Sequence, residues 1–217
     1  MNEFTHFLTG FLVARYILKK KHTQFESFFC AVAAFILDFD YLVQSLIPSF
    51  EHGVITHTIL GALLCALLFS VITWYSLQSI MKEIQLSFRH LLLIAFAGVL
   101  SHLFLDSFTF YEGAYDAIHH VYFWPIWDFP VHINTMFPQA TYDLRVWLEV
   151  GYTVVIVAVW MVYGWLIKKE NPFGMLRTSQ WWPNYKDPIP QSVQKISRIY
   201  LGSICVLFVL YTLVNLI

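Results

Sequence analysis

Long stretches without a charged residue set the strongest constraint on how this chain folds. Residues 58–81 form an uncharged run of 24, residues 150–167 a run of 18 and residues 199–217 a run of 19. A helix of about 20 apolar residues crosses the roughly 30 Å hydrocarbon core of a bilayer. The composition agrees, because 58% of the 217 residues are hydrophobic and 12% are charged, whereas about a quarter are charged in soluble domains. We therefore expect an integral membrane protein.

The hydrophobic pattern predicts an all-α fold, a polytopic integral membrane helical bundle of about six transmembrane helices. The predicted helices cover residues 4–18, 25–47, 57–80, 90–110, 146–168 and 198–217. We expect a metal-site helical domain over residues 1–145, with an aromatic interfacial loop at 111–145. Residues 146–217 are expected to add two transmembrane helices joined by a cytoplasmic connection, in which the segment 171–190 carries no chemical motif.

The basic residues predict the orientation of these helices. With six helices the connections alternate between the two sides of the membrane, and 11 of the 13 Lys and Arg residues then share one side. Arg145 lies on the other side, and Arg15 lies within the first helix near its basic end. Because basic residues concentrate in cytoplasmic connections, we expect a multi-pass protein of the cell membrane with both termini outside the cytoplasm.

Composition also bears on partners and thiols. A net charge of −1 gives no reason to expect nucleic acid as a partner. Cys30, Cys65 and Cys205 lie in apolar runs without a CxxC spacing, so we expect buried free thiols rather than disulfides. The loop at 111–145 is rich in Trp, Tyr and Phe, which is typical of a segment at the membrane interface. The lipid bilayer is therefore the partner that the sequence predicts most directly.

Ionisable side chains inside apolar segments are costly and are candidates for function. Seven of them, from four helices, fall on the outer side of the predicted topology: His6, Asp38, Asp40, His52, His57, His102 and Asp106. The positions of Lys and Arg were used to derive the topology, and these seven residues were not. The gathering of the seven on one side is therefore independent support for a functional site there.

The spacing of these residues indicates metal binding. His102 and Asp106 are four residues apart on a helix, so they project from one face and can hold one ion. An imidazole nitrogen with a carboxylate oxygen suits zinc, and also manganese or iron. Further ligands can come from the converging helices: His6, Asp40 and His57.

Asp38 and Asp40 cannot both face the same metal ion from a regular helix, because residues two apart point in different directions. We expect Asp40 to be a metal ligand and Asp38 to lie outside the ligand shell or on a second ion. A metal ion lowers the pKa of water and polarises a scissile group. Asp38 or His52 is the expected general base.

The order of these residues resembles that of a known family. The motifs that carry the resemblance are Thr5-His6, Asp38-Phe39-Asp40, His52 to Thr58, Ser101-His102 to Asp106, and then Thr109, Gly113 and Trp124-Pro125. Over about residues 4–130 they are similar to the YdjM-like family of membrane-bound, predicted metal-dependent hydrolases, itself distantly similar to zinc-dependent phospholipase C and single-strand nucleases. The resemblance implies a set of metal ligands, in which Asp106 would bridge two ions: His6, Asp40, His57, His102 and Asp106.

The chain departs from the family pattern at two places. Gly53-Val54 stand where the family has Arg-Gly, and Leu37 replaces a proline before the aspartate pair. An arginine that binds phosphate is therefore missing, so metal ions must supply most of the positive charge that a phosphoester requires. The sequence assigns no role to three later histidines: His119, His120 and His132.

The sequence thus predicts an integral membrane metal-dependent hydrolase with its site at the extracytoplasmic face. We expect a divalent metal, zinc in the first place, with more than one ion for a phosphoester. Because the predicted site lies near the interface, the expected substrate is a phospholipid or another amphiphilic phosphoester. The alternative is a transporter or channel that passes protons or metal ions through the His/Asp cluster. The one-sided position of the cluster speaks against that alternative.

Overall fold

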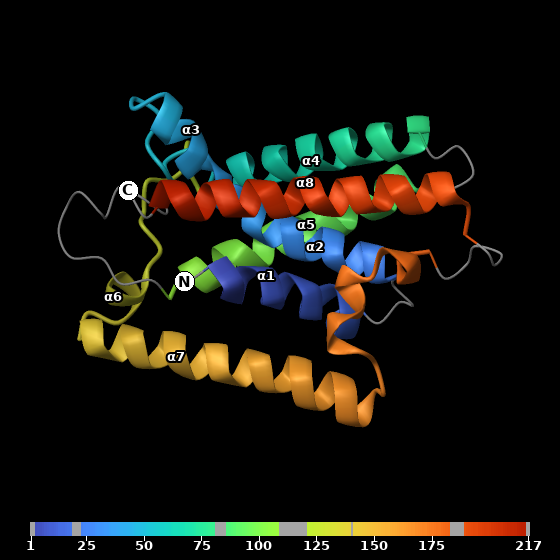
Figure 1. Ribbon diagram of the computed structural model, residues 1–217. Coiled ribbons are helices and arrows are strands. Elements are labelled where there is room, and N and C mark those ends of the chain that lie inside the picture. Colours follow the sequence, from blue (N-terminus) through green and yellow to red (C-terminus); the bar gives the residue numbers. More distant parts are fainter. Residues whose placement is uncertain are drawn as a thin grey trace.

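A computed structural model gives the fold of the chain (Figure 1). It describes residues 3–18, 23–80, 86–108, 121–139, 141–182 and 189–215. Within these ranges every regular element is helical, as the all-α prediction requires. His119 and His120 lie outside the described residues.

The helices follow the predicted ranges closely. In chain order they are α1 (Glu3–Leu12) with the π-helical η1 (Val13–Ile17), α2 (Gln24–Phe35) with the 3₁₀ turn η2 (Ile36–Phe39), α3 (Asp40–Leu46), α4 (Ile59–Ile80), α5 (Phe88–Asp106), the short α6 (Ile133–Met136), α7 (Tyr142–Ala158) with the π-helical η4 (Val159–Ile167), the 3₁₀ turns η5 (Pro172–Leu176) and η6 (Thr178–Gln180), and α8 (Gln191–Asn215). The clearest difference is at α8, which begins at Gln191 rather than at 198.

Side-chain caps explain where several helices begin. The Thr23 hydroxyl accepts a hydrogen bond from the backbone N–H of Glu26 at 3.1 Å, and the Glu26 carboxylate accepts one from the Thr23 N–H at 2.7 Å. This reciprocal pair satisfies two N–H groups that have no partner inside the helix. Ser87 caps α5 and Thr141 caps α7 through one hydrogen bond each, in which the hydroxyl oxygen accepts from a backbone N–H of the first turn.

Five helical segments among the described residues are long and apolar enough to cross a membrane: Gln24–Leu46, Ile59–Ser79, Phe88–Asp106, Tyr142–Ile167 and Gln191–Val214. The first helix is not one of them. Its 10 α-helical and 5 π-helical residues extend about 22 Å at about 1.5 Å per residue, which is less than the hydrocarbon thickness. The described residues therefore contain five candidate spans and one shorter helix, and the predicted count of about six is not confirmed.

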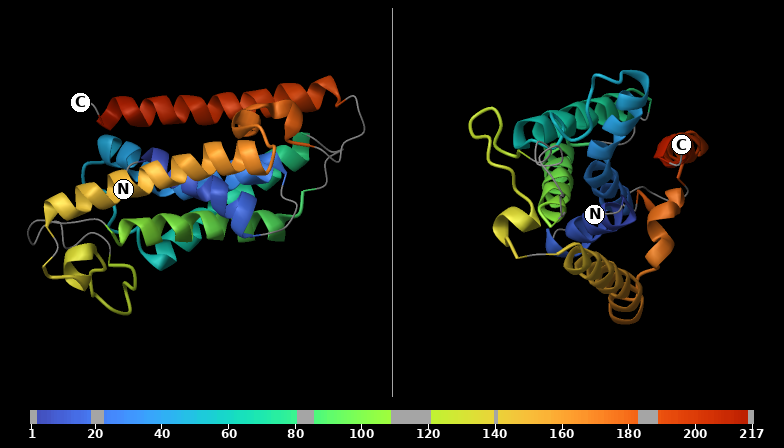
Figure 2. Two further views of the ribbon diagram at one scale, coloured as in Figure 1. Left: turned by 90° about the horizontal axis from the view of Figure 1, so that it is seen from below. Right: turned by 90° about the vertical axis from the view of Figure 1, so that its left-hand side faces the viewer.

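The helices run side by side and alternate in direction (Figure 1). α2 packs between α1 and α5, α4 packs on α5, and α7 lies against α1. α8 lies along the outside, in contact with α3 and η6 (Figure 2). The start of α1 and the end of α8 lie towards the same end of the bundle (Figure 1).

Two glycines let the backbones of three helices approach closely. A Cβ atom on Gly10 of α1 would lie 2.6 Å from the Ala34 Cβ atom, and one on Gly98 of α5 would lie 2.6 Å from the Cys30 carbonyl oxygen. Both neighbours belong to α2, so α1 and α5 each pack closely against this helix. Small residues at helix contacts are typical of membrane bundles. The close contact fixes the relative positions of the three helices that carry most of the candidate site.

The segment after η4 packs on α2 towards the end of the bundle opposite the chain termini (Figures 1 and 2). The ring of Trp181 is fully buried and packs on Phe25 and Phe28 of α2, with ring centroids 5.4 Å and 5.2 Å apart. Nearby, the guanidinium of Arg15 donates two hydrogen bonds of 2.8 Å to the carboxylate of Glu170. These contacts tie residues 146–217 to the N-terminal helices.

The outer helices expose apolar side chains, and this affects the cysteines. Cys30 is buried and Cys65 is half-buried, but Cys205 of α8 is exposed. The expectation of three buried thiols is therefore wrong for Cys205, because α8 has few neighbours in the bundle. All three are free, as expected.

Tyr122 holds the described part of the aromatic loop to α4 and α5. The Tyr122 hydroxyl donates a hydrogen bond of 2.6 Å to the Leu103 carbonyl oxygen, and the Tyr122 carbonyl oxygen accepts one of 2.8 Å from the Ile59 N–H. The large apolar side chains that follow are exposed: Phe123, Trp124, Ile126, Trp127 and Phe129. Exposed aromatic side chains at the end of a bundle suit a membrane interface.

Candidate metal centre

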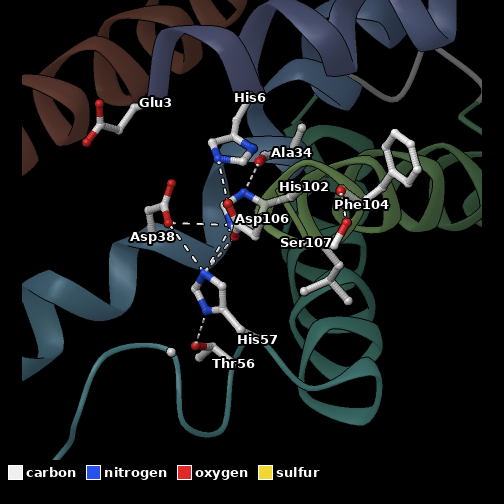
Figure 3. A network of polar contacts seen from close by, with 12 residues as sticks. Glu3, His6, Ala34, Asp38, Thr56, His57, His102, Phe104, Asp106 and Ser107 are labelled. Carbon is white, nitrogen blue, oxygen red and sulfur yellow. Dashed lines mark hydrogen bonds and ion pairs between the residues drawn. The ribbon is translucent and has the colours of Figure 1, made fainter. Parts of the chain in front are cut away.

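Buried histidine and aspartate side chains from four segments converge near the start of α1 (Figure 3). Three overlapping groups of three residues can each be defined, and within each group the possible ligand atoms lie within 4.8 Å of one another. The groups are His6 with Asp38 and His102, Asp38 with His52 and His57, and His57 with His102 and Asp106. Six of the seven residues singled out in the sequence are members, and Asp40 is not.

His102 and Asp106 form the firmest part of the cluster. Their side chains meet one turn apart on α5, with 2.8 Å between Nε2 and Oδ2. The other ring nitrogen of His102, Nδ1, lies 2.7 Å from the carbonyl oxygen of Ala34. Because a carbonyl oxygen only accepts hydrogen bonds, Nδ1 carries a proton. When the ring is neutral, its Nε2 lone pair faces the cluster, an arrangement typical of metal-binding histidines.

His57 enters the cluster from the loop before α4. Its Nε2 atom lies 3.0 Å from His102 Nε2 and 3.5 Å from a carboxylate oxygen of both Asp38 and Asp106. Burial lowers the pKa of His57, and the nearby carboxylate of Asp38 offsets only part of this effect. The imidazole is therefore neutral near pH 7, which is the form that binds metals.

His6 closes the cluster from α1. Its ring stacks on that of His102, with centroids 3.9 Å apart and 21° between the planes. Its Nε2 atom lies 3.1 Å from Asp106 Oδ1. Its Nδ1 atom is buried and has no hydrogen-bond partner among the described residues. Asp106 thus lies between two imidazoles, with one carboxylate oxygen towards each.

A change of helix type brings both Asp38 and Asp40 into the interior. α2 gives way to the 3₁₀ turn η2 before Asp40. With about 3.0 residues per turn, side chains two apart differ by about 120° instead of about 160°. Asp38 Oδ1 faces the cluster, 3.5 Å from Nε2 of His57 and of His102.

The carboxylate of Asp40 instead faces the loop that precedes α4. It accepts hydrogen bonds from His52 Nδ1, from the Gly53 N–H at 2.9 Å and from the Thr56 hydroxyl. The expectation that Asp40 is the ligand assumed a regular helix, and the 3₁₀ turn removes that premise. Asp38, not Asp40, has the position that favours contact with an ion in the cluster.

His52 lies at the rim of the cluster. Its side chain is 18% exposed, while that of His57 is 1% exposed. The ring stacks on Tyr41, with centroids 3.6 Å apart, and Nδ1 bonds to Asp40. A histidine fixed through Nδ1 and open to its surroundings suits proton transfer.

The donor atoms fit a divalent metal ion. Zinc binds imidazole nitrogen and carboxylate oxygen at about 2.0–2.2 Å, so atoms around a tetrahedral ion lie about 3.3–3.6 Å apart. Three distances of 3.5 Å match this spacing, from His57 Nε2 to Asp38 and Asp106 and from His102 Nε2 to Asp38. The distances from His102 Nε2 to His57 Nε2 and to Asp106 are shorter, at 3.0 Å and 2.8 Å. The buried Nδ1 of His6, without a hydrogen-bond partner among the described residues, is a further donor. Buried electron-pair donors this close to one another are stabilised by a cation between them.

The two other histidines among the described residues lie away from the cluster. His90 pairs with Glu26 at 3.0 Å at the opposite end of α5, and His132 is buried at the start of α6. Sequence reasoning missed two groups that orient the cluster, the carbonyl oxygen of Ala34 and the hydroxyl of Thr56. A threonine directly before a candidate histidine was a usable signal, but a backbone carbonyl gives none.

Comparison with known proteins places the chain in a family. The family model described as YdjM inner membrane protein matches residues 1–216. The match includes the last two helices, which lie beyond the motifs at about residues 4–130. No curated protein and no solved structure matches the chain, so the distant similarity to zinc-dependent phospholipase C stays an expectation.

Proposed function

The chain belongs to the YdjM inner membrane protein family, and we propose that it is an integral membrane metal-dependent hydrolase. The proposed ligands are His6, Asp38, His57, His102 and Asp106. One observation carries this proposal: in a buried position, a nitrogen of His57 and a nitrogen of His102 lie within 3.5 Å of each other and of carboxylate oxygens of both Asp38 and Asp106. A divalent ion held there would supply Lewis acidity, which activates water and polarises the scissile group.

The residues of the chain would position and protonate the reactants. The carbonyl of Ala34 fixes the ring of His102, and Asp106 connects the rings of His6 and His102. Asp40 holds Nδ1 of His52, which leaves the other ring nitrogen to accept a proton from attacking water or to protonate the leaving group. In this proposal His52 is the general base and Asp40 orients it.

An amphiphilic substrate is the best match to the surroundings of the cluster. The loop that is anchored through Tyr122 lies against α4 and α5 and exposes aromatic side chains. Such side chains sit at the level of lipid headgroups. A lipid headgroup in the interface would therefore be within reach of a centre at this end of the bundle. This supports a phospholipid or similar phosphoester as the substrate.

The charge of the region bears on the number of ions. Neither residues 23–81 nor residues 90–144 contain a lysine or an arginine. A phosphoester transition state requires positive charge, which metal ions must then supply. Two or more carboxylates largely neutralise one ion, so a phosphoesterase here should hold at least two. The overlapping groups around Asp38 and His57 give room for neighbouring ions.

Metal content and turnover test the proposal together. The purified protein in detergent is analysed for metal per chain and assayed on vesicles of defined phospholipid. Two or three ions per chain with phospholipid turnover would support phosphoester hydrolysis. One ion without such turnover would reject the phosphoester and leave an uncharged ester or amide. A protein without metal would reject the metal-dependent hydrolase altogether.

The transporter alternative requires polar groups across the membrane. His102 and His90 lie about 18 Å apart along α5 at about 1.5 Å per residue, and residues 91–100 between them are apolar. The chain therefore offers no polar path along this helix, which favours the hydrolase.

We propose the extracytoplasmic side for the centre, from the distribution of basic residues. A tag placed after Ile217 should be cleaved by protease added to intact spheroplasts. A fully protected tag would move the centre to the cytoplasmic side.

A further inference from the structure

The carboxylate of Asp40 accepts hydrogen bonds from three groups of the loop before α4. The donors are the Gly53 N–H at 2.9 Å, His52 Nδ1 and the Thr56 hydroxyl. Gly53 has a φ of 79°, a conformation that side chains disfavour, and this turns its N–H towards Asp40. An ionised carboxylate has no proton to donate. The single proton of the Thr56 hydroxyl therefore points to Asp40.

The same hydroxyl determines the proton position on His57. The Thr56 oxygen lies 3.1 Å from His57 Nδ1. Since its only proton is directed at Asp40, the oxygen can only accept from His57. Nδ1 of His57 must then carry the proton of the neutral ring. Its Nε2 lone pair consequently points at the other donor atoms of the cluster (Figure 3).

A proton on Nε2 of His57, instead of on Nδ1, would prevent the site from binding a metal ion. Nε2 of His57 lies 3.0 Å from Nε2 of His102, whose own proton is fixed on Nδ1 by Ala34. With a proton on Nε2, His57 would donate to His102, and the two imidazoles would satisfy each other. The lone pair of His57 would then be on Nδ1 and face Thr56, and neither ring would direct a free lone pair at an ion in the cluster.

We infer that Asp40 and Thr56 are positioning residues that keep the proton of His57 on Nδ1, so that Nε2 is available to bind a metal ion. The inference rests on the proposed metal centre. The chain of hydrogen bonds runs from His57 through Thr56 to Asp40, which also holds His52. Asp40 thus orients a ligand on one side and the rim histidine on the other.

The test replaces the hydroxyl and keeps the shape. Thr56→Val removes the hydrogen bonds, Thr56→Ser retains them, and Thr73→Val is the matched control because Thr73 is a buried threonine of α4 that contacts Tyr200. Zinc affinity is measured by competition with a chelator. We expect Thr56→Val to weaken zinc binding about 10–100-fold, the usual effect of losing an outer-shell partner. Thr56→Ser and Thr73→Val should bind zinc as the wild type does.

A second measurement reads the proton position directly. ¹⁵N chemical shifts of His57 in the metal-free wild type should report the Nδ1–H tautomer, and Thr56→Val should shift the population towards Nε2–H. A wild-type protein with the proton on Nε2 would overturn the inference, as would a Thr56→Val variant that binds zinc with wild-type affinity. If the wild type bound no metal, the proposed function would fail, and the tautomer of His57 would still decide on the hydrogen-bond chain.

Discussion

The inner and outer helices of the bundle differ in how they are held. In the most apolar stretch of Gln24–Leu46, 56% of the residues are buried, against 17% for Tyr142–Ile167 and 11% for Gln191–Val214. All members of the candidate metal groups come from α1, η2, α5 or the loop before α4. Close packing therefore coincides with the proposed chemistry, and the outer helices present apolar surface that suits lipid.

The outer helices attach through a small number of polar contacts within the described residues. Thr5 and Thr153 share a hydrogen bond of 2.9 Å between α1 and α7, and the Tyr211 hydroxyl of α8 donates one of 2.8 Å to Glu3. Interhelical hydrogen bonds of this kind contribute modestly in membranes, about 0.6 kcal/mol on average. Close backbone contacts between the inner helices therefore hold the candidate ligands in place, while the outer helices add few polar contacts and an apolar surface.

The largest expected effect is the loss of a ligand in the inner helices. His102→Ala should weaken metal binding by more than about 100-fold, because even outer-shell changes cost about 10–100-fold, and it should abolish activity. His90→Ala, at the other end of α5, is the control and should change neither metal content nor turnover. Equal damage from both variants would mean that the polar cluster extends across the membrane, and the transporter would become the better interpretation.

A matched pair of glycine substitutions compares the packing of the two regions. A Cβ atom on Gly98 would lie 2.6 Å from a backbone oxygen of α2, whereas one on Gly202 of α8 has nothing within 4 Å. Overpacking costs about 1–3 kcal/mol, so Gly98→Ala should lower the apparent Tm in detergent. Gly202→Ala should leave it unchanged or raise it, because alanine favours a helix by about 0.5–1 kcal/mol. Similar shifts of the apparent Tm in both variants would contradict the difference in packing between the inner and the outer helices.

The smallest expected effect concerns the link between α8 and α1. Tyr211→Phe removes the hydrogen bond to Glu3 and keeps the ring contact with Phe35. The loss should be about 0.6 kcal/mol, the average for interhelical hydrogen bonds in membranes, seen as a small fall in the apparent Tm with zinc affinity preserved. A marked fall in zinc affinity would instead show that α8 takes part in shaping the centre.

Most of the helices could be predicted from the sequence, because an uncharged run of about 20 residues has few alternatives to a membrane-spanning helix. The first helix was the exception. Its apolar pattern predicts a helix. Whether that helix is as long as the hydrocarbon core is thick depends on the residue at which it ends, which is Ile17 in the structure. The count of spans therefore needed the structure.

The candidate site was predictable in its members but not in their orientation. His102 and Asp106 meet as their spacing on a regular helix requires. Asp38 and Asp40 depend on a 3₁₀ turn that no residue pattern in α2 announces. The positions of Thr56 and of the Ala34 carbonyl depend on tertiary packing, which local sequence does not encode.

The burial of Asp38 and Asp40 within the segment Gln24–Leu46 bears on how the protein enters the membrane. During translocon-mediated insertion, an aspartate at the centre of a helix costs about 2.5–3.5 kcal/mol, and less towards an end. Ile59–Ser79 has no charge and can partition into lipid alone. We expect the segment that carries the two aspartates to stay next to α1 and to insert fully into the bilayer only when α5 packs against it. Formation of the centre and integration into the bilayer would then be one event during biogenesis.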